Sequence, residues 1–365
     1  MYGEGFIIFA VMKKEDKKAV LKGMTLSELK EYFLSIGESK YRAEQLFNWV
    51  YNRVSFDFNE MQNFPKTLRT RLESTALIKT LEPVAVQDSP STGTKKYLYS
   101  TSDNRKIESV LIPEGERNTL CISTQVGCPL DCKFCATGLM GYKRNLSSGE
   151  IVDQYLLTAK EAGKQAITNI VYMGMGEPLL NFDNTVKSVE IFTHELTKGL
   201  SRKRITISTA GIPNKIIEIA ELGLRIKLAL SLHSCFDDIR SQIMPINKKY
   251  SLKENIEALK FYTKKTKTRA TFEYTMLKGI NDRDEDIKAI VKLCSQLPSK
   301  INIIPFNSIR HMNPGGISAE LEPTSLDNIL KFADKLRGHN ITVLVRETQG
   351  DDIAAACGQL AVSMN

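Results

Sequence analysis

Three cysteines that stand close together are the residues of this chain most clearly suited to chemistry. They are Cys128, Cys132 and Cys135, and they fall within eight residues of one another on a segment that also contains a proline and an aspartate. Thiolates spaced in this way on one loop can bind a single iron–sulfur cluster. Because only three are local, a four-iron cluster would keep one iron with a free coordination position. The spacing therefore predicts a redox cluster at which a small molecule can bind directly to iron.

Two other interpretations of these cysteines remain open on the residues alone. A structural zinc site usually has four ligands, commonly as two paired motifs. The sequence has no second Cys-x-x-Cys pair, and its four histidines (His194, His233, His311 and His339) are scattered. Three buried structural thiols are the other alternative. Both interpretations leave unexplained why the three cysteines share one short loop, so the cluster is the favoured hypothesis.

The elements that must position this loop follow a regular pattern from about residue 118 onward. Short β-rich runs at 119–124, 167–173, 204–208, 225–232, 269–275 and 301–305 alternate with helical stretches at 148–162, 183–196, 213–221, 252–264, 284–295 and 325–337. Ser147 with Glu150 makes a capping box ahead of the first of these helices. Such βα repeats favour parallel strands joined by right-handed crossovers. The pattern predicts an α/β fold, and periodicity alone leaves both an open sheet and a curled, barrel-like sheet possible. A further strand is expected at 341–345.

Polar residues recur where these strands end. Ligands of parallel α/β folds bind at the carboxyl ends of strands. The residues at those ends are Gly176 and Glu177, Ser208, Ser231 with Leu232 and His233, and Asn307. Glycine allows a ligand to approach the backbone closely, and a glutamate can accept hydrogen bonds from an ammonium group. Each residue alone could serve only in a loop or a cap, but their shared placement predicts one pocket.

The N-terminal part of the chain has a different character. Residues 24–90 are expected to form a small helical unit, in which Thr25 and Glu28 make a capping box and Pro65 opens the third helix. Residues 41–54 form its second helix.

Four further segments complete the expected organisation. Residues 1–23 are an N-terminal extension, 94–113 a β-hairpin extension, 114–350 the core, and 351–365 a C-terminal tail that carries Cys357. The extension lacks the features of a secretory leader. A cytoplasmic location is therefore expected.

Composition and charge add two constraints. No run of 18 or more apolar residues appears, so no membrane span is expected. The net charge is +8, and two groups of cations stand out: Lys198, Arg202, Lys203 and Arg204, and Lys260, Lys264, Lys265, Lys267 and Arg269. Each group is either a solvated face or a phosphate-binding patch. Seven cysteines, an odd number, argue against a disulfide framework.

The cysteine motif, with Phe134 before its last cysteine, resembles that of the radical S-adenosylmethionine (SAM) superfamily. The resemblance implies a partial (β/α)6 barrel in which Cys128, Cys132 and Cys135 bind a 4Fe–4S cluster. It also implies that SAM binds the open iron and is cleaved reductively to a 5′-deoxyadenosyl radical. The residues expected to bind SAM are Gly176, Glu177, Ser208, Ser231, Leu232, His233 and Asn307.

Longer blocks resemble the RlmN/Cfr group of that superfamily. They are 120–128, 141–146, 173–181, 244–248 and 350–360, and the N-terminal helices resemble the group's accessory RNA-binding domain. Pro178 and the segment 113–120 resemble the RlmN branch. That branch methylates carbon 2 of adenosine in 23S ribosomal RNA, at the peptidyl transferase centre, and in transfer RNA at position 37. Methylation of carbon 8, as in the Cfr branch, is the alternative.

The resemblance also implies roles for residues outside the cluster loop. Cys357 is expected to carry the new carbon as S-methylcysteine, Cys121 to resolve the adduct through a transient disulfide with Cys357, and Glu108 to accept a proton. Two SAM molecules per turnover, a flavodoxin-like electron donor and a monomeric enzyme are expected. Cys235 and Cys294 have no such match and are expected to be structural thiols.

Two rival functions differ in class or substrate. One is an iron–sulfur electron carrier or sensor, which needs neither Cys357 nor the strand-end residues. The other is a radical SAM enzyme that acts on a small molecule, which the basic clusters and the helical N-terminal unit make less attractive.

Overall fold

The computed structural model describes residues 18–163, 166–197 and 199–362, and a ten-stranded sheet forms its centre. Residues 1–17 of the expected N-terminal extension lie outside this range. The strands of the sheet, in chain order, are β3 (Leu81–Asp88), β4 (Lys95–Thr101), β5 (Lys106–Glu114), β6 (Arg117–Cys121), β9 (Asn169–Tyr172), β10 (Ile205–Thr209), β11 (Lys227–Ser231), β12 (Ala270–Met276), β13 (Ser299–Pro305) and β14 (Val343–Val345). Their spatial order is β14-β13-β12-β11-β10-β9-β6-β5-β4-β3.

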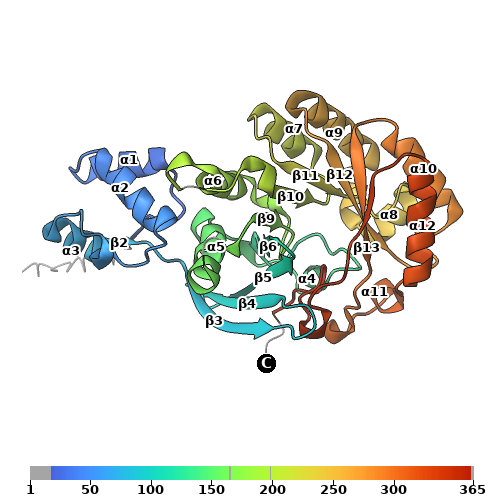
Figure 1. Cartoon of the computed structure of the whole chain (residues 1–365), viewed down its shortest axis with the longest axis horizontal. Coiled ribbons are helices and arrows are strands. Elements are labelled where there is room, and N and C mark those ends of the chain that lie inside the picture. The colour runs from blue at the N-terminus through green and yellow to red at the C-terminus, as the bar shows by residue number, and fades with distance from the viewer. Residues whose placement is uncertain (1–17, 164–165, 198, 363–365) are drawn as a thin grey trace, which may run out of the picture.

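The strands from β6 to β14 form a parallel half barrel. Each is parallel to its neighbour, and the two edge strands, β14 and β3, do not pair with each other. The helices that follow the strands are α5 (Ser148–Ala162), α6 (Phe182–Thr193), α7 (Pro213–Glu221), α9 (Leu252–Thr266), α10 (Asp284–Cys294) and α12 (Leu326–Gly338). They lie along the outer face of the curved sheet (Figure 1). The predicted α/β fold is confirmed, in its barrel-like form.

Alternation along the strands separates the core from the barrel interior. In β12, Phe272 and Tyr274 are fully buried in the apolar core, whereas Glu273 and Thr275 line a cavity inside the barrel. Successive side chains of a strand point to opposite faces. The apolar residues therefore anchor the helices outside, and the polar ones are left for chemistry inside.

The capping boxes seen in the sequence start their helices as predicted. At α5 the Ser147 hydroxyl accepts a hydrogen bond from the Glu150 N–H at 3.2 Å, and the Ser147 N–H donates to the Glu150 carboxylate at 2.8 Å. Thr25 and Glu28 make the same exchange at α1 (Leu26–Ser35). These contacts satisfy backbone donors that the first helical turn leaves free.

Three antiparallel strands extend the half barrel at one side. The predicted hairpin of residues 94–113 is present as β4 and β5. Residues 81–88, expected to belong to the helical unit, instead form β3, which pairs with β4. Only Leu81 of this edge strand is buried, and the register shifts between Pro83 and Ala85. Such an exposed, interrupted strand has no apolar alternation by which its sequence could indicate it.

The N-terminal unit contains α1, α2 (Tyr41–Phe47) with a following π-helical turn, and α3 (Lys66–Thr75). It projects from the barrel beside α5 and α6 (Figure 1). A buried ion pair holds it there: the Lys22 ammonium lies 3.0 Å from the Asp153 carboxylate on α5, and both side chains are fully buried. None of the helices in the described ranges is long and apolar enough to cross a membrane.

Candidate active site

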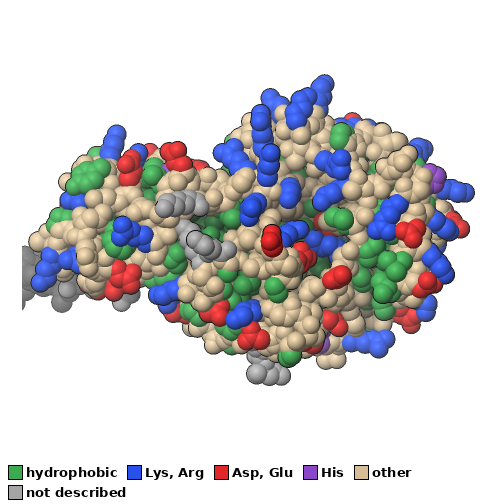
Figure 2. Space-filling view, viewed as in Figure 1, with side chains coloured by type: hydrophobic (Ala, Val, Ile, Leu, Met, Phe, Trp, Pro, Cys, Tyr) green, Lys and Arg blue, Asp and Glu red, His purple; other side chains and the backbone are tan. Residues whose placement is uncertain are grey.

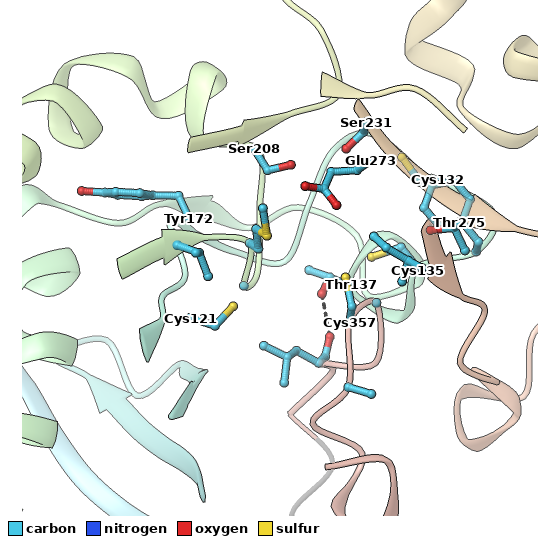
Figure 3. A pocket seen from close by; sticks show the side chains of 18 of the residues that line it. Cys121, Cys132, Cys135, Thr137, Tyr172, Ser208, Ser231, Glu273, Thr275 and Cys357 are labelled. Carbon is cyan, nitrogen blue, oxygen red and sulfur yellow. Dashed lines mark hydrogen bonds between the residues drawn. The ribbon is translucent and has the colours of Figure 1, made fainter. Parts of the chain in front are cut away.

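A cavity inside the half barrel brings most of the predicted site residues together (Figure 3). Its wall includes Cys121, Cys128, Cys132, Cys135, Gly176, Glu177, Ser208, Ser231, His233, Asn307 and Cys357. Two predicted residues, Glu108 and Leu232, are not among the described residues that line it. Leu232 is fully buried, and its backbone N–H donates to the Glu273 carbonyl at 2.9 Å. Leu232 thus links β11 to β12 rather than facing the cavity.

The three clustered cysteines lie on a loop between β7 (Gln125–Val126) and α4 (Ala136–Leu139). Burial, together with the nearby Cys135, raises the pKa of Cys128 to about 12. Burial likewise raises the pKa of Cys132, with further contributions from Cys135 and Cys128. The three thiols therefore lie within electrostatic reach of one another on one cavity wall. Binding a metal would offset the cost of deprotonating them there.

The arrangement of these thiols fits a cluster better than a single ion. In the described part of the chain, no three Cys, His, Asp or Glu side chains converge on one metal-ion position. A four-iron cluster is wider than an ion, so its thiolate ligands stand further apart than those of zinc. The zinc interpretation therefore gains no support, whereas three cysteines around a common hollow suit an iron–sulfur cluster.

The turn after β9 requires glycine at position 176. Gly176 has a φ of +99°, and a Cβ there would lie 2.5 Å from the Gln125 Cβ. The next residue, Glu177, is buried, and burial raises the pKa of its carboxyl group. Its two oxygens accept hydrogen bonds from the Leu179 N–H at 2.9 Å and the Ala210 N–H at 2.8 Å. Glu177 thereby fixes this turn against the end of β10 and retains lone pairs toward the cavity.

His233 is held as a neutral ring. Its Nδ1 accepts a hydrogen bond from the Thr275 N–H at 2.9 Å, so its proton sits on Nε2. Burial, together with the nearby Arg240, lowers the pKa of His233 to about 3. The ring packs edge-on against Phe134 of the cysteine loop, with centroids 4.5 Å apart. His233 therefore joins the end of β11 to the cluster loop.

Arg240, which the sequence pattern did not indicate, ties two strand ends together. This arginine is fully buried on α8 (Asp237–Ile243) and donates to the Ala210, Ser231 and Leu232 carbonyls at 2.7, 2.9 and 3.1 Å. A buried guanidinium needs such partners to offset its desolvation. Arg240 thus fixes the backbone on either side of the cavity wall that carries Ser231.

Glu273 and Arg346 also line the cavity and were not predicted. Figure 3 shows Glu273 beside Ser231. One Glu273 oxygen accepts from the Asn302 amide at 2.9 Å, and the other has no hydrogen-bond partner among the described residues. The alternation of Thr271, Glu273 and Thr275 with large apolar residues along β12 was the signal that could have indicated Glu273.

Cys357 and Cys121 face the same cavity from different parts of the chain (Figure 3). Both are free thiols. Burial by the surrounding protein, with a contribution from Glu273, raises the pKa of Cys357 to about 11. Cys357 is nevertheless an exposed residue, and its side chain is open to the cavity. Burial, together with the nearby Cys357, raises the pKa of Cys121 to about 12. Asn307 steadies the tail, because its amide donates to the Cys357 carbonyl at 3.1 Å.

Glu108 is held beneath the tail. The Lys96 ammonium on β4 lies 3.6 Å from Glu108 on β5, and both are almost completely inaccessible to solvent. The Glu108 carboxylate accepts hydrogen bonds from the Ala361 and Val362 N–H groups, each at 3.1 Å. Lys96 donates to the Ile353 carbonyl at 2.6 Å. This pair, named the tail clasp, therefore grips the chain on both sides of Cys357.

Removing the cation of the tail clasp is expected to destabilise the fold. Lys96→Met leaves the Glu108 carboxylate buried without a counter-charge, which should lower the free energy of unfolding by about 3–5 kcal/mol. Urea unfolding monitored by circular dichroism measures this.

The matched control is Lys331→Met, because the ion pair of Lys331 with Asp327 is exposed, at 68% and 72%. The control should change the free energy of unfolding by less than about 1 kcal/mol. In the double variant Lys96→Met/Glu108→Gln, part of the loss should be recovered, because no charge is left buried. Equal effects of Lys96→Met and Lys331→Met would contradict the clasp.

Comparisons with known proteins match this geometry. A family model of the radical SAM superfamily matches residues 122–294, and a model of the ribosomal RNA large subunit methyltransferase N-terminal domain matches residues 20–78. A radical SAM methyltransferase from Sphaerobacter thermophilus, known from its crystal structure, superposes with a TM-score of 0.87 at 39% identity, covering 94% of this chain and 99% of that one. The cysteine-lined cavity in a half barrel and these matches define a radical SAM enzyme, which binds a 4Fe–4S cluster and SAM.

The curated relatives narrow the class further. The "Dual-specificity RNA methyltransferase RlmN" of Geobacter sulfurreducens is 42% identical over 342 residues, which are 93% of this chain and 91% of the relative. The "Probable dual-specificity RNA methyltransferase RlmN" of Dictyoglomus turgidum is 42% identical over 337 residues, or 92% and 94% of the two chains. The chain belongs to the RlmN family.

Proposed function

We propose that this protein methylates carbon 2 of adenosine in 23S ribosomal RNA and in transfer RNA, with Cys357 as the carrier of the new carbon. The observation that supports this most directly is that two free thiols, Cys121 and Cys357, share one cavity with the three cluster cysteines. An electron carrier needs no such pair. Membership of the RlmN family supports the RNA substrates.

Some residues of the cavity would hold the cluster and SAM, and others would react with the methyl group. Cys128, Cys132 and Cys135 would hold the 4Fe–4S cluster, while Gly176, Glu177, Ser208, Ser231, His233 and Asn307 would surround SAM. Together, cluster and SAM supply a radical able to remove hydrogen from an unactivated methyl group. That ability matters because carbon 2 of adenine is electron-poor and is not a nucleophile.

The thiols perform the covalent steps. The Cys357 thiolate first attacks the methyl carbon of one SAM, which forms a thioether and displaces S-adenosylhomocysteine. A second SAM is used to activate that methyl group, so two are consumed per product. Once its carbon is bonded to the base, the adduct must lose one electron, for which the cluster would be the acceptor, and the proton of carbon 2. The Cys121 thiolate then attacks the Cys357 sulfur to form a disulfide, and the released methylene carbon takes up a proton to become the methyl group of the RNA. Two electrons from a flavodoxin-like donor then restore both thiols.

Tethering makes the carbon transfer efficient. A methyl group fixed to Cys357 reacts within one complex, which replaces a bimolecular encounter by an intramolecular step. The adenine must be unstacked to reach it. Glu108 accepts the proton from the base, and this requires Ala361 and Val362 to release its carboxylate, to which they now donate. The tail clasp would therefore open during each turnover.

The remaining parts have supporting roles. The N-terminal unit, proposed as an RNA-binding domain within residues 24–90, overlaps the matched methyltransferase N-terminal domain at residues 20–78. The hairpin of residues 94–113, the core of 114–350 and the tail of 351–365 would act as one monomeric enzyme in the cytoplasm.

Mass spectrometry of nucleosides tests the proposed reaction. Anaerobic enzyme with SAM, a reductant and a 23S ribosomal RNA fragment should give 2-methyladenosine, with one S-adenosylhomocysteine and one 5′-deoxyadenosine per methyl group. Unmodified transfer RNA should give the same nucleoside. The Cys357→Ala variant, tested in parallel, should give none. Formation of 8-methyladenosine, or cofactor cleavage that never depends on RNA, would refute the proposal.

A further inference from the structure

Basic residues gather at the amino ends of the parallel strands, the end of the half barrel opposite the cluster loop. Arg117 opens β6, Arg204 directly precedes β10, Lys227 opens β11, Arg269 directly precedes β12, and Lys300 is the second residue of β13. Because the strands are parallel, their amino ends share one edge of the sheet. These five residues are named the cationic collar.

The members of the cationic collar lie close enough to repel one another. Partial burial lowers the pKa of Lys227, and Arg117, Lys300 and Arg204 lower it further. Burial also lowers the pKa of Lys300, and Arg117 and Arg269 lower it further. Glu273 acts in the opposite direction and raises the pKa of Lys300. The five charges therefore lie near one another at one edge of the sheet.

Little within the protein neutralises these charges. In the described part of the chain, Arg117 alone among the five forms an ion pair, with Glu114 at 3.8 Å. Arg204 and Arg269 donate only to the Thr168 carbonyl and the Thr342 hydroxyl. Clustered cations without carboxylate partners attract a polyanion, such as a nucleic acid backbone.

One member of the cationic collar, Arg117, reaches the reaction cavity. Arg117, Thr119 and Cys121, the alternate residues of β6, all line that cavity. At about 3.3 Å per residue, Arg117 lies roughly 13 Å along the strand from Cys121. Arg117 thus stands at the opposite end of β6 from the Cys121 thiol. Arg346, also on the cavity wall, carries positive charge inward toward Cys357.

The surface around the cationic collar carries further positive charge. Figure 2 shows lysine and arginine side chains standing around a hollow over the barrel strands. Lys260, Lys264 and Lys267 line a groove beside Arg269. The two basic groups of the sequence precede two parallel strands of the sheet: residues 202–204 precede β10, and residues 260–269 precede β12. Both groups therefore lead to the amino-end edge of the sheet. Lys198 lies outside the described residues.

We propose that the cationic collar binds the backbone phosphates on both sides of the target adenosine, so that the unstacked base enters the cavity from the amino end of β6. This deepens the proposed RNA methylation and rests on it. The cluster and SAM would then occupy one end of the cavity and the RNA the other, with Cys357 between them.

The salt dependence of RNA binding tests the cationic collar. The variant Lys227→Gln/Lys300→Gln removes two phosphate contacts, so the slope of log Kd against log salt should fall by about 1.4, the value for single-stranded nucleic acid. Binding near 0.15 M salt should weaken about tenfold. Filter binding of the full-length protein to a 23S ribosomal RNA fragment, between 50 and 200 mM salt, measures both.

The matched control is Lys253→Gln/Lys288→Gln, which removes the same charge from exposed positions at the start and middle of outer helices α9 and α10. It should leave the slope unchanged. An unchanged slope in Lys227→Gln/Lys300→Gln, or an equal fall in the control, overturns the collar. Methylation is measured separately: if the wild-type protein binds RNA with the expected slope but makes no methyladenosine, the proposed reaction fails and the collar stands.

Discussion

Replacing Cys128 by alanine is expected to abolish both the brown colour of the cluster and all reductive cleavage of SAM. Cys128, Cys132 and Cys135 are the clustered thiols on the cavity wall, and two thiolates alone would leave the cluster unanchored. Iron content, the visible absorption spectrum and the yield of 5′-deoxyadenosine after anaerobic reconstitution measure the effect.

The control for this variant is Cys294→Ala. Cys294 is the last residue of α10 and does not line the cavity within the described chain. It should retain full iron content and full cleavage. A Cys128→Ala protein that still cleaved SAM, or one that bound zinc as tightly as the unaltered chain, would remove the basis for radical chemistry.

Replacing Cys121 by alanine is expected to trap the enzyme on its RNA. Cleavage of SAM should continue, because Cys121 lies on β6 and not on the cluster loop. Without its thiol, the sulfur of Cys357 has no partner to form a disulfide, so the bond between Cys357 and the base persists. Denaturing electrophoresis with labelled RNA should show a covalent complex, and release of methylated RNA should fall to the background level.

Two comparisons locate the trapped bond. The double variant Cys121→Ala/Cys357→Ala should form no complex, and Cys235→Ala should release product at the normal rate. Normal product release by Cys121→Ala would show that some other group resolves the adduct.

The elements of the fold could be predicted where local chemistry decides them. Ser147 with Glu150 marks the start of α5 because both partners lie within one helical turn. The parallel strands could be predicted from the alternation of β-rich and helical segments, because the period of apolar residues differs between helix and strand. β3 was not predicted, because an edge strand with one buried residue, Leu81, has no such period.

The site could be predicted only in part. Strand-end positions such as Ser208 and Ser231 could be placed on one cavity, because parallel strands align their carboxyl ends. The surroundings of Glu108 could not, since Ala361 and Val362 are more than 250 residues away in sequence. The role of Arg240 likewise depends on carbonyls from two separate strands, which only the folded chain brings together.

The tail clasp defines the length of the segment that carries Cys357. Lys96 holds the backbone at Ile353, and Glu108 holds it at Ala361 until the tail clasp opens. Under the proposed mechanism, the sulfur of Cys357 would then meet cofactor, base and Cys121 in turn while the chain stays held at Ile353. Insertion of one residue between Ile353 and Ala361 would change how far the Cys357 sulfur can reach, so the proposed reaction depends on the length of this segment.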